Sequence, residues 1–397
     1  MLSWEFPPRI VGGIARHVDG LSRALSKVGV EVDVFTCDFP GADAEEQVDG
    51  VHVHRIDSYK FPAPDFASWN YMMNLNMQRA ASEFIRGSNG QVDILHAHDW
   101  LSATAAMGMK HMLRLPLVAT IHSTEYGRRN GLHTPYQRMI HDMEHWLAYE
   151  AWRVICCSEY MASHVSWALG LPREKVDVIP NGVDWKEYAR PYDRKNFRRH
   201  FASPREKLVL FVGRLVHEKG ASVLVEAIPK ILSRVDAKFV IVGDGYMRDQ
   251  LISRAQALHV EAKVYTTGFL DDESVKLLFR TADVCVVPSL YEPFGIVALE
   301  AMAAKAPLVV SDVGGLSEII EHDKTGVKIY ANSPDSLAWA VTRVLTDTRY
   351  ADTLRNGSYE QVQQVYDWNT IASTTKTVYE RVLEESRSGN WKILTRT

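Results

Sequence analysis

This 397-residue sequence has few cysteines, no long apolar run and no large excess of charge of one sign. Four cysteines without CxxC spacing exclude a disulfide framework and argue against a thiol-based zinc or redox site. In apolar surroundings a reduced cysteine behaves as a small hydrophobic side chain. The four are Cys37, Cys156, Cys157 and Cys285.

No apolar stretch approaches the ~18 residues that a membrane-spanning helix needs. The opening sequence MLSWEFPP lacks the basic region and apolar core of a secretory signal. We therefore expect a soluble, cytoplasmic protein.

The charges are nearly balanced, with 45 Lys and Arg against 49 Asp and Glu and a net charge of −4. Bulk charge gives no reason to expect nucleic-acid binding. The segment 69–86 carries only Arg79 and Arg86 as basic residues, so it does not resemble a membrane-docking helix. The expected partners are therefore neither nucleic acid nor membrane.

Short β-branched runs alternate with longer amphipathic patterns along most of the chain. The runs LVLFVG (208–213) and FVIVG (239–243) are apolar throughout, as strands covered on both faces should be. This alternation predicts an α/β protein with parallel sheets. The expected strands, about twelve in all, favour two doubly wound sheets over one very wide sheet.

A charged stretch divides the chain. Residues 184–206 contain two prolines and show no periodicity of a buried core. We therefore predict one Rossmann-like domain over residues 1–184, an interdomain linker over 185–206, a second Rossmann-like domain over 207–368 and a final helix within 369–397.

Two cationic residues follow the first strand of the second domain. The sequence GRLVHEKG (213–220) places Arg214 and Lys219 between a strand and a helix. A guanidinium and an ammonium at such a position can neutralise a diphosphate leaving group. A solvated charged turn explains the same residues equally well.

Two glutamates follow a later strand. In SLYEPFGIVALEAMAAK (289–305), Glu292 and Glu300 are separated by seven residues, and a helix is expected to begin near Phe294. First-turn amides of a helix can bind phosphate, while Glu300 lies roughly 7–8 Å further along the axis, where it can meet ribose hydroxyls. The amides in question are those of Gly295, Ile296 and Val297.

Polar residues also follow two strands of the first domain. DILHAHDW (93–100) places His98, Asp99 and Trp100 where they can line a sugar site, and TIHSTEYGRRNG (120–131) places His122 at a strand end. A lone histidine at such a point is more often structural than catalytic. The residues themselves leave the role of His122 open.

Several familiar motifs are missing from the sequence. It contains no P-loop, GxSxG elbow, HExxH or Asp-x-Asp, and neither Gly12–Gly13 nor Gly243–Asp244–Gly245 completes a GxGxxG fingerprint. His141 and His145 have helical i, i+4 spacing but no convincing third metal ligand. We therefore expect no metal site.

Taken in order, GRLVHEKG, VGDG, TGFL, EPFGIVALE and GGLSEII resemble the C-terminal domain of family-4 retaining glycosyltransferases. SWEFPPRIVGGIARHV, HAHDW and TIHSTEYGR look like the glycogen and starch synthase-like branch of that family. The resemblance covers nearly the whole chain.

The resemblance implies a GT-B fold, in which two Rossmann-like domains face across a cleft and the last helix crosses back to the first. It implies a nucleoside diphosphate-glucose donor, an α-glucan acceptor and no metal cofactor. The implied catalytic residues are His122, Glu292, Arg214 and Lys219. The implied donor contacts are Gly12, Gly13, Arg214, Lys219, Gly243, Gly268, Phe269, Leu270, Phe294, Gly295, Ile296, Val297 and Glu300.

One position departs from the pattern. Bacterial glycogen synthases place a lysine two residues before the glycine pair, where this chain has Ile10, with Arg9 adjacent. The expected function is transfer of glucose, with retention, to the non-reducing end of an α-1,4-glucan. The alternatives are a family-4 transferase that uses another sugar nucleotide for cell-surface or lipid-linked polysaccharide, a sugar-nucleotide 2-epimerase-like enzyme and a non-catalytic binding protein.

Overall fold

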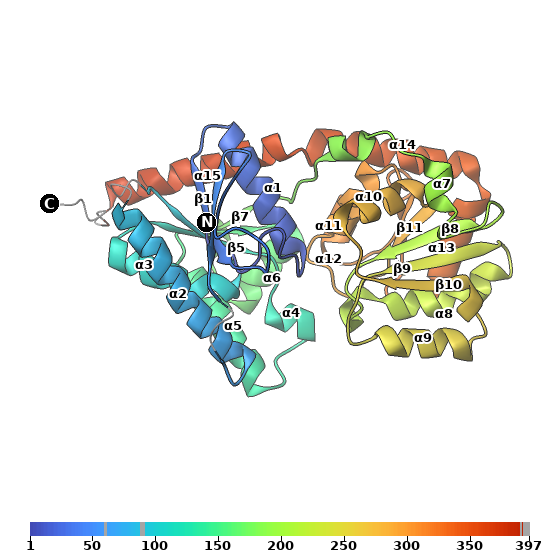
Figure 1. The fold of residues 1–397 in the computed structure, drawn as a ribbon, viewed down its shortest axis with the longest axis horizontal. Helices are drawn as coiled ribbons and strands as arrows, with labels where there is room; N and C mark the ends of the chain where they lie inside the picture. The colour runs from blue at the N-terminus through green and yellow to red at the C-terminus, as the bar shows by residue number, and fades with distance from the viewer. Residues whose placement is uncertain (59–61, 88–91, 390, 392–397) are drawn as a thin grey trace. The chain divides into compact units, whose positions relative to one another are not determined.

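A computed structural model describes residues 1–58, 62–87, 92–389 and 391. The chain divides into two compact units (Figure 1). The first unit comprises Met1–Gly182 together with Trp368–Thr397, and the second comprises Val183–Asp367. Each unit is built around its own predominantly parallel sheet, which confirms the predicted α/β class with two Rossmann-like domains.

The opening residues of the chain complete the sheet of the first unit. Leu2 forms parallel bridges to Phe35 and Ala97 and so joins its two groups of strands. Those groups have the orders β1-β3-β2 and β4-β5-β6-β7, and only β2 runs antiparallel to its neighbour. The strands are β1 (Val32–Cys37), β2 (Glu45–Val48), β3 (Val51–Ile56), β4 (Leu95–His98), β5 (Leu117–Ile121), β6 (Arg153–Cys156) and β7 (Val176–Val178).

Helices of the first unit begin at residues that suit helix ends. Thr134 and Gln137 form a reciprocal capping box at the start of α5, because each side chain accepts a backbone N–H of the other residue. The helices are α1 (Gly13–Lys27), α2 (Phe66–Gly87), η1 (Trp100–Ser102), α3 (Ala103–Leu113), α4 (Glu125–Arg129), α5 (Pro135–Glu150), α6 (Glu159–Ala168), η2 (Arg173–Lys175) and α15 (Trp368–Ser388).

The last helix, α15, belongs to the first unit although it is the end of the chain. It packs against α1, and its Tyr379 hydroxyl lies 2.6 Å from Nδ1 of His96. The indole of Trp368 sits so close to Gly20 and Gly182 that a Cβ atom would come within 2.3 Å and 2.6 Å of it, respectively. Only glycine fits at these two contacts, which fix the start of α15.

The second unit contains a six-stranded, fully parallel sheet in the order β10-β9-β8-β11-β12-β13. Its β8 and β11 are neighbours, so the loops that follow them lie at the same edge. Phe211 and Phe239 are fully buried in its core. The strands are β8 (Lys207–Val212), β9 (Ala237–Val242), β10 (Val264–Gly268), β11 (Val284–Val287), β12 (Leu308–Ser311) and β13 (Val327–Ile329).

Helices cover both faces of the second sheet, with α8 and α9 on one side and α10 and α11 on the other (Figure 1). The helices are η3 (Trp185–Ala189), α7 (Arg194–Arg198), η4 (His217–Lys219), α8 (Ala221–Leu232), α9 (Arg248–Ala257), η5 (Glu261–Lys263), α10 (Asp272–Thr281), α11 (Ile296–Ala303), α12 (Gly314–Ile319), α13 (Pro334–Thr346) and α14 (Thr348–Val365).

Residues 185–206, predicted to form a linker, instead fold as part of the second unit. This stretch contains η3 and α7, and α7 packs against α10. Arg198 forms an ion pair with Asp283 at 2.7 Å and donates to the carbonyl oxygen of Thr281 at 3.1 Å. The high charge of the stretch therefore reflects specific pairing with the domain surface rather than an extended connection.

All four cysteines are free and buried. Within the described ranges, no helix combines the length and apolar character needed to cross a membrane.

Candidate functional site

Lys219 and Glu292 meet where the first and fourth strands of the second unit end. The loop after β8 carries Lys219, and the loop after β11 carries Glu292. The ammonium Nζ lies 3.0 Å and 2.8 Å from the two carboxylate oxygens, and Ser289 donates its hydroxyl to Oε2 at 3.0 Å. Because Glu292 is buried, this lysine and hydroxyl offset the loss of hydration of its carboxylate.

Gly220 allows the two loops to approach each other. It adopts a φ of +68°, and a Cβ atom at this position would lie 1.9 Å from the carbonyl oxygen of Pro288. Leu290 also donates its N–H to the carbonyl oxygen of Glu218 at 2.8 Å. The backbone therefore locks the loop that carries Lys219 against the loop that carries Glu292.

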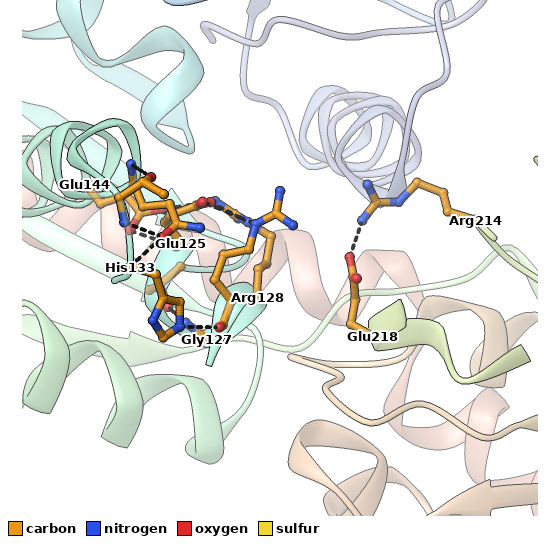
Figure 2. A network of polar contacts seen from close by, with 11 residues as sticks. Glu125, Gly127, Arg128, His133, Glu144, Arg214 and Glu218 are labelled. Carbon is orange, nitrogen blue, oxygen red and sulfur yellow. Dashed lines mark hydrogen bonds and ion pairs between the residues drawn. The ribbon is translucent and has the colours of Figure 1, made fainter. Parts of the chain in front are cut away.

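Arg214 has a more open environment than Lys219. Figure 2 shows its guanidinium directed toward Glu218, at 3.5 Å, and half of the Arg214 side chain is exposed. A half-exposed arginine at the end of a strand is available to an anionic ligand. The pairing with Glu218 positions it without burying it.

The start of α11 offers backbone donors to an anion. Gly295 caps the helix at a φ of +118°, and a Cβ atom there would lie 2.6 Å from Cδ2 of Leu316. Ile296 and Val297 follow as first-turn residues, whose amides an α-helix does not pair internally. Glu300 lies on the same helix and is buried. The helix dipole and these amides together favour a bound phosphate at this end.

Gly243 and Gly268 bring a second pair of loops together. The N–H of Gly243 donates to the carbonyl oxygen of Gly268 at 2.9 Å, and a Cβ on Gly243 would lie 2.0 Å from the carbonyl oxygen of Gly213. The next side chain, Phe269, is 74% exposed, and Leu270 is half-buried. An exposed aromatic ring beside close-packed backbone is a surface on which a planar base can stack.

The side chain of Phe294, an expected donor contact, is part of the core. Its ring is buried and packs edge-on against Tyr366, with ring centroids 6.1 Å apart. Only the backbone of Phe294 is left for a ligand, because the side chain belongs to the core.

The expected acceptor residues in the first unit also need a correction. His98, Asp99 and Trp100 are all buried, so none of these side chains lines an open sugar site. They instead support His122, which is partly exposed. Nδ1 of His98 lies 3.2 Å from Nε2 of His122, and Oδ1 of Asp99 accepts the backbone N–H of His122 at 2.7 Å.

His17 also lies beside His122 and was not predicted from the sequence. It projects from α1, and its ring centroid lies 4.6 Å from that of His122. Nδ1 of His17 is 2.6 Å from Oδ1 of Asn181. Burial lowers the pKa of His17 to about 4, so the imidazole is neutral at pH 7. In the sequence, His17 stands on the apolar face of a helix, a position typical of core residues. No neighbouring residue indicates a functional role.

Glu5 binds the amide of Gly12, one of the two glycines expected to approach a phosphate. Its Oε2 accepts the N–H groups of Val11 and Gly12 at 2.6 Å and 3.0 Å. Burial raises the pKa of the Glu5 carboxyl, while these backbone donors lower it. The turn at Val11–Gly12 therefore binds an anion, and the anion is a carboxylate of the same chain.

A buried acid–base network follows His122 in the chain and was not predicted (Figure 2). Both carboxylate oxygens of Glu144 accept the backbone N–H of Glu125, at 2.8 Å and 3.0 Å. Arg128 pairs with Glu125 at 3.0 Å and with Glu144 at 3.3 Å. Burial raises the pKa of Glu144 to about 8, and the Arg128 charge opposes that rise. The network fixes α4 directly after the strand that presents His122.

Two family models match the two halves of the chain. Residues 193–361 match the family model described as glycosyl transferases group 1. Residues 11–187 match the model described as glycosyltransferase family 4.

Two relatives align along nearly the whole chain. An uncharacterised glycosyltransferase of Methanocaldococcus jannaschii is 42% identical over 388 residues, covering 97% of this chain and 98% of the relative. A glycogen synthase of Mycobacterium tuberculosis is 35% identical over 393 residues, covering 96% and 93%.

Solved structures share the fold. Sucrose-phosphate synthase from Thermosynechococcus elongatus has a TM-score of 0.82 at 26% identity and covers 94% of each chain. The catalytic domain of starch synthase IV from Arabidopsis thaliana has a TM-score of 0.78 at 17% identity, covering 96% of this chain and 98% of that one. The chain thus belongs to glycosyltransferase family 4 and is a glycosyltransferase with the two-domain GT-B fold.

Proposed function

We propose that this glycosyltransferase moves glucose from a nucleoside diphosphate-glucose to the non-reducing end of an α-1,4-glucan, with retention and without a metal ion. The observation that carries the proposal is the Lys219–Glu292 pair, set at the same sheet edge as the anion-binding start of α11. Similarity to a glycogen synthase over 96% of the chain supports the choice of glucose and glucan.

We assign binding of the sugar-nucleotide donor to the second unit. Arg214 and the ammonium of Lys219 neutralise the diphosphate, and the first-turn amides of α11 bind it from the helix end. Glu300 then meets the ribose hydroxyls. Lys219 holds a full positive charge close to the leaving group, which is the role that a metal ion plays in other transferases.

We assign transfer to a front-face reaction. The bond between the sugar C1 and the diphosphate oxygen breaks, and a bond from C1 to the acceptor oxygen forms on the same face. The acceptor hydroxyl proton passes to the departing diphosphate. Glu292 is an unsuitable nucleophile, because its carboxylate is buried and held by Lys219 and Ser289. It positions the sugar instead. We propose a sugar-positioning role for His122 as well, as the family resemblance implies.

The test is release of nucleoside diphosphate from UDP-, ADP- and GDP-glucose, each with and without maltooligosaccharide. Acceptor-dependent release from one donor, unaffected by EDTA, supports the proposal and identifies the base. Solved neighbours include HepE of Anabaena with UDP bound and starch synthase IV with ADP bound, so the assay includes both UDP-glucose and ADP-glucose. Release from no glucose donor would reject the proposed sugar.

A phosphorylated polyol is a second candidate acceptor. A D-inositol 3-phosphate glycosyltransferase of Pseudarthrobacter chlorophenolicus is 30% identical over 331 residues, covering 80% of this chain. Replacing the maltooligosaccharide with D-inositol 3-phosphate in the same assay separates the two acceptors. A third outcome, a sugar nucleotide isomerised without acceptor, would favour the epimerase-like alternative.

A further inference from the structure

Three histidines converge in the first unit: His17 and His98 are buried and His122 is partly exposed. His17 comes from α1, His98 ends β4, and His122 follows β5. Each offers one ring nitrogen such that the three nitrogens lie within 4.8 Å of one another. Among the described residues, this is the one group of three or more potential ligands that comes so close.

The hydrogen bond to Asn181 determines which nitrogen of His17 carries its proton. The amide oxygen of Asn181 can only accept, so the neutral imidazole donates from Nδ1 and keeps a bare lone pair on Nε2. In the described structure this buried Nε2 has no hydrogen-bond partner. A histidine whose far nitrogen is held by a carbonyl oxygen and whose near nitrogen is bare is arranged as metal-binding histidines are.

The other two histidines already have the separation of metal ligands. Nδ1 of His98 and Nε2 of His122 are 3.2 Å apart. In a tetrahedral site with metal–nitrogen bonds of ~2.0–2.1 Å, neighbouring nitrogens lie about 3.3 Å apart. With a metal ion at Nδ1, the proton of His98 moves to Nε2, which is buried and has no partner within the described residues.

The surroundings favour a cation. Each neutral imidazole has one ring nitrogen without a proton, and this is the atom that coordinates a metal ion. The nearest acidic group in the hydrogen-bond network is Asp99, whose carboxylate accepts the backbone N–H of His122. When ionised, this carboxylate balances part of the charge of a divalent ion.

We propose that His17, His98 and His122 form a site for a divalent transition metal ion of the zinc, cobalt or nickel type. Imidazole ligands favour these ions over Mg²⁺ and Ca²⁺. Three protein ligands leave a fourth position for water. The ion is not a cofactor of transfer, because it occupies the nitrogen that His122 would offer to a sugar.

The binding test uses the full-length protein after removal of metals with a chelator. Titration with Co²⁺ is followed by visible absorption, and bound Zn²⁺ is counted by mass spectrometry after dialysis. We expect one ion per chain, with absorption bands typical of four-coordinate cobalt. His17→Gln, His98→Gln and His122→Gln are each expected to weaken binding by about tenfold or more.

A matched control removes the other histidine pair. His141 and His145 lie one turn apart on α5, and Nδ1 of His145 is 2.8 Å from the carbonyl oxygen of Leu169. The double variant H141Q/H145Q should bind cobalt as the parent does. Equal loss in this control, no binding by the parent, or binding unchanged in H122Q would each overturn the proposal. H122Q keeps the test decisive if a variant of the two buried histidines fails to fold, as judged by circular dichroism.

Activity provides a second readout, which rests on the proposed function. Zn²⁺ should inhibit glucosyl transfer, EDTA should restore it, and H17Q should need about tenfold more Zn²⁺ for the same inhibition. Metal binding without inhibition would leave the site standing and count against the role of His122. Transfer activity without any metal binding would overturn the metal site and leave the proposed function standing.

Discussion

The ammonium of Lys219 lies 2.8 Å from the carboxylate oxygen Oε2 of Glu292, although 73 residues separate the two in the chain. Parallel pairing of β8 with β11 brings their loops to one edge of the second sheet. A buried carboxylate thus holds a partly exposed cation in one place. The Lys219–Glu292 pair therefore contributes both to the stability of the fold and to the proposed binding of the donor.

Replacing Lys219 with alanine should lower kcat by about 100- to 1,000-fold, the effect typical of losing one fixed electrostatic contact in a transition state. It should also destabilise the protein by about 1–3 kcal/mol, because Glu292 keeps a buried charge without its cation. Steady-state kinetics and chemical unfolding measure the two effects.

The double variant K219M/E292Q separates them. It removes both charges, so much of the lost stability should return while activity stays low. Activity close to that of the parent in K219A would remove Lys219 from the site.

Glu144 should make the first unit less stable as the pH rises above 6.5. Burial raises its pKa to about 8 in the folded protein, from 4.5. Between these values the folded protein keeps a proton that the unfolded chain releases, so stability should fall by up to about 1.4 kcal/mol per pH unit until the folded group ionises. Chemical unfolding at pH 6.5, 7.5 and 8.5 measures the slope.

Glu144→Gln is the matched variant, because it keeps the size of the side chain and cannot ionise. It should reduce the slope between pH 6.5 and 8, while the part contributed by Asp99, whose pKa burial raises to about 7, remains. An unchanged slope would show that Glu144 is already ionised at pH 6.5. His17 does not contribute to the slope above pH 6.5, because its pKa of about 4 in the folded protein affects stability only below pH 6.5.

Asn181→Ala should destabilise the first unit by about 1–3 kcal/mol, since the N–H of the buried His17 ring loses its acceptor. The proton on His17 should then be free to move between its two nitrogens. Nitrogen-15 NMR of the histidine rings detects this as a change in the shifts of a single imidazole. Unaltered stability and ring shifts would contradict the assigned tautomer.

Gly220→Ala should cost about 2–4 kcal/mol and reduce activity, because the new Cβ would clash with the carbonyl oxygen of Pro288 as well as strain the backbone. Gly29 is the control, since its φ is +82° but a Cβ there meets nothing within 4 Å. Gly29→Ala should cost only about 1 kcal/mol from strain. Equal costs would show that the contact with Pro288 is unimportant.

Much of the fold could be predicted from sequence, because strands buried on both faces are apolar throughout. Leu208–Phe211 is an example of such an apolar strand. The helix Trp368–Ser388 was predicted from its apolar stripe. β2 escaped prediction because EEQV is exposed and polar, and it forms an antiparallel edge. The segment 185–206 was misread because its charges pair with a distant part of the domain, which local composition does not reveal.

The candidate site could be predicted only in part. Lys219 and Glu292 were identified by their positions after strands, yet their direct pairing depends on which strands are neighbours. The burial of His98, Asp99 and Trp100 depends on the packing around β4, and the Glu125–Glu144 bond joins residues 19 positions apart. His17 gave no signal, because its partner Asn181 is 164 residues away.

The central claim is best tested by the product of transfer. Nucleoside diphosphate-glucose labelled with carbon-13 is incubated with maltotetraose, and the new glycosidic linkage is observed by NMR. The account predicts an α-1,4-linked glucose at the non-reducing end, formed in the presence of EDTA. A β-linked product, or no labelled glucose on the oligosaccharide with any of the three donors, would contradict it.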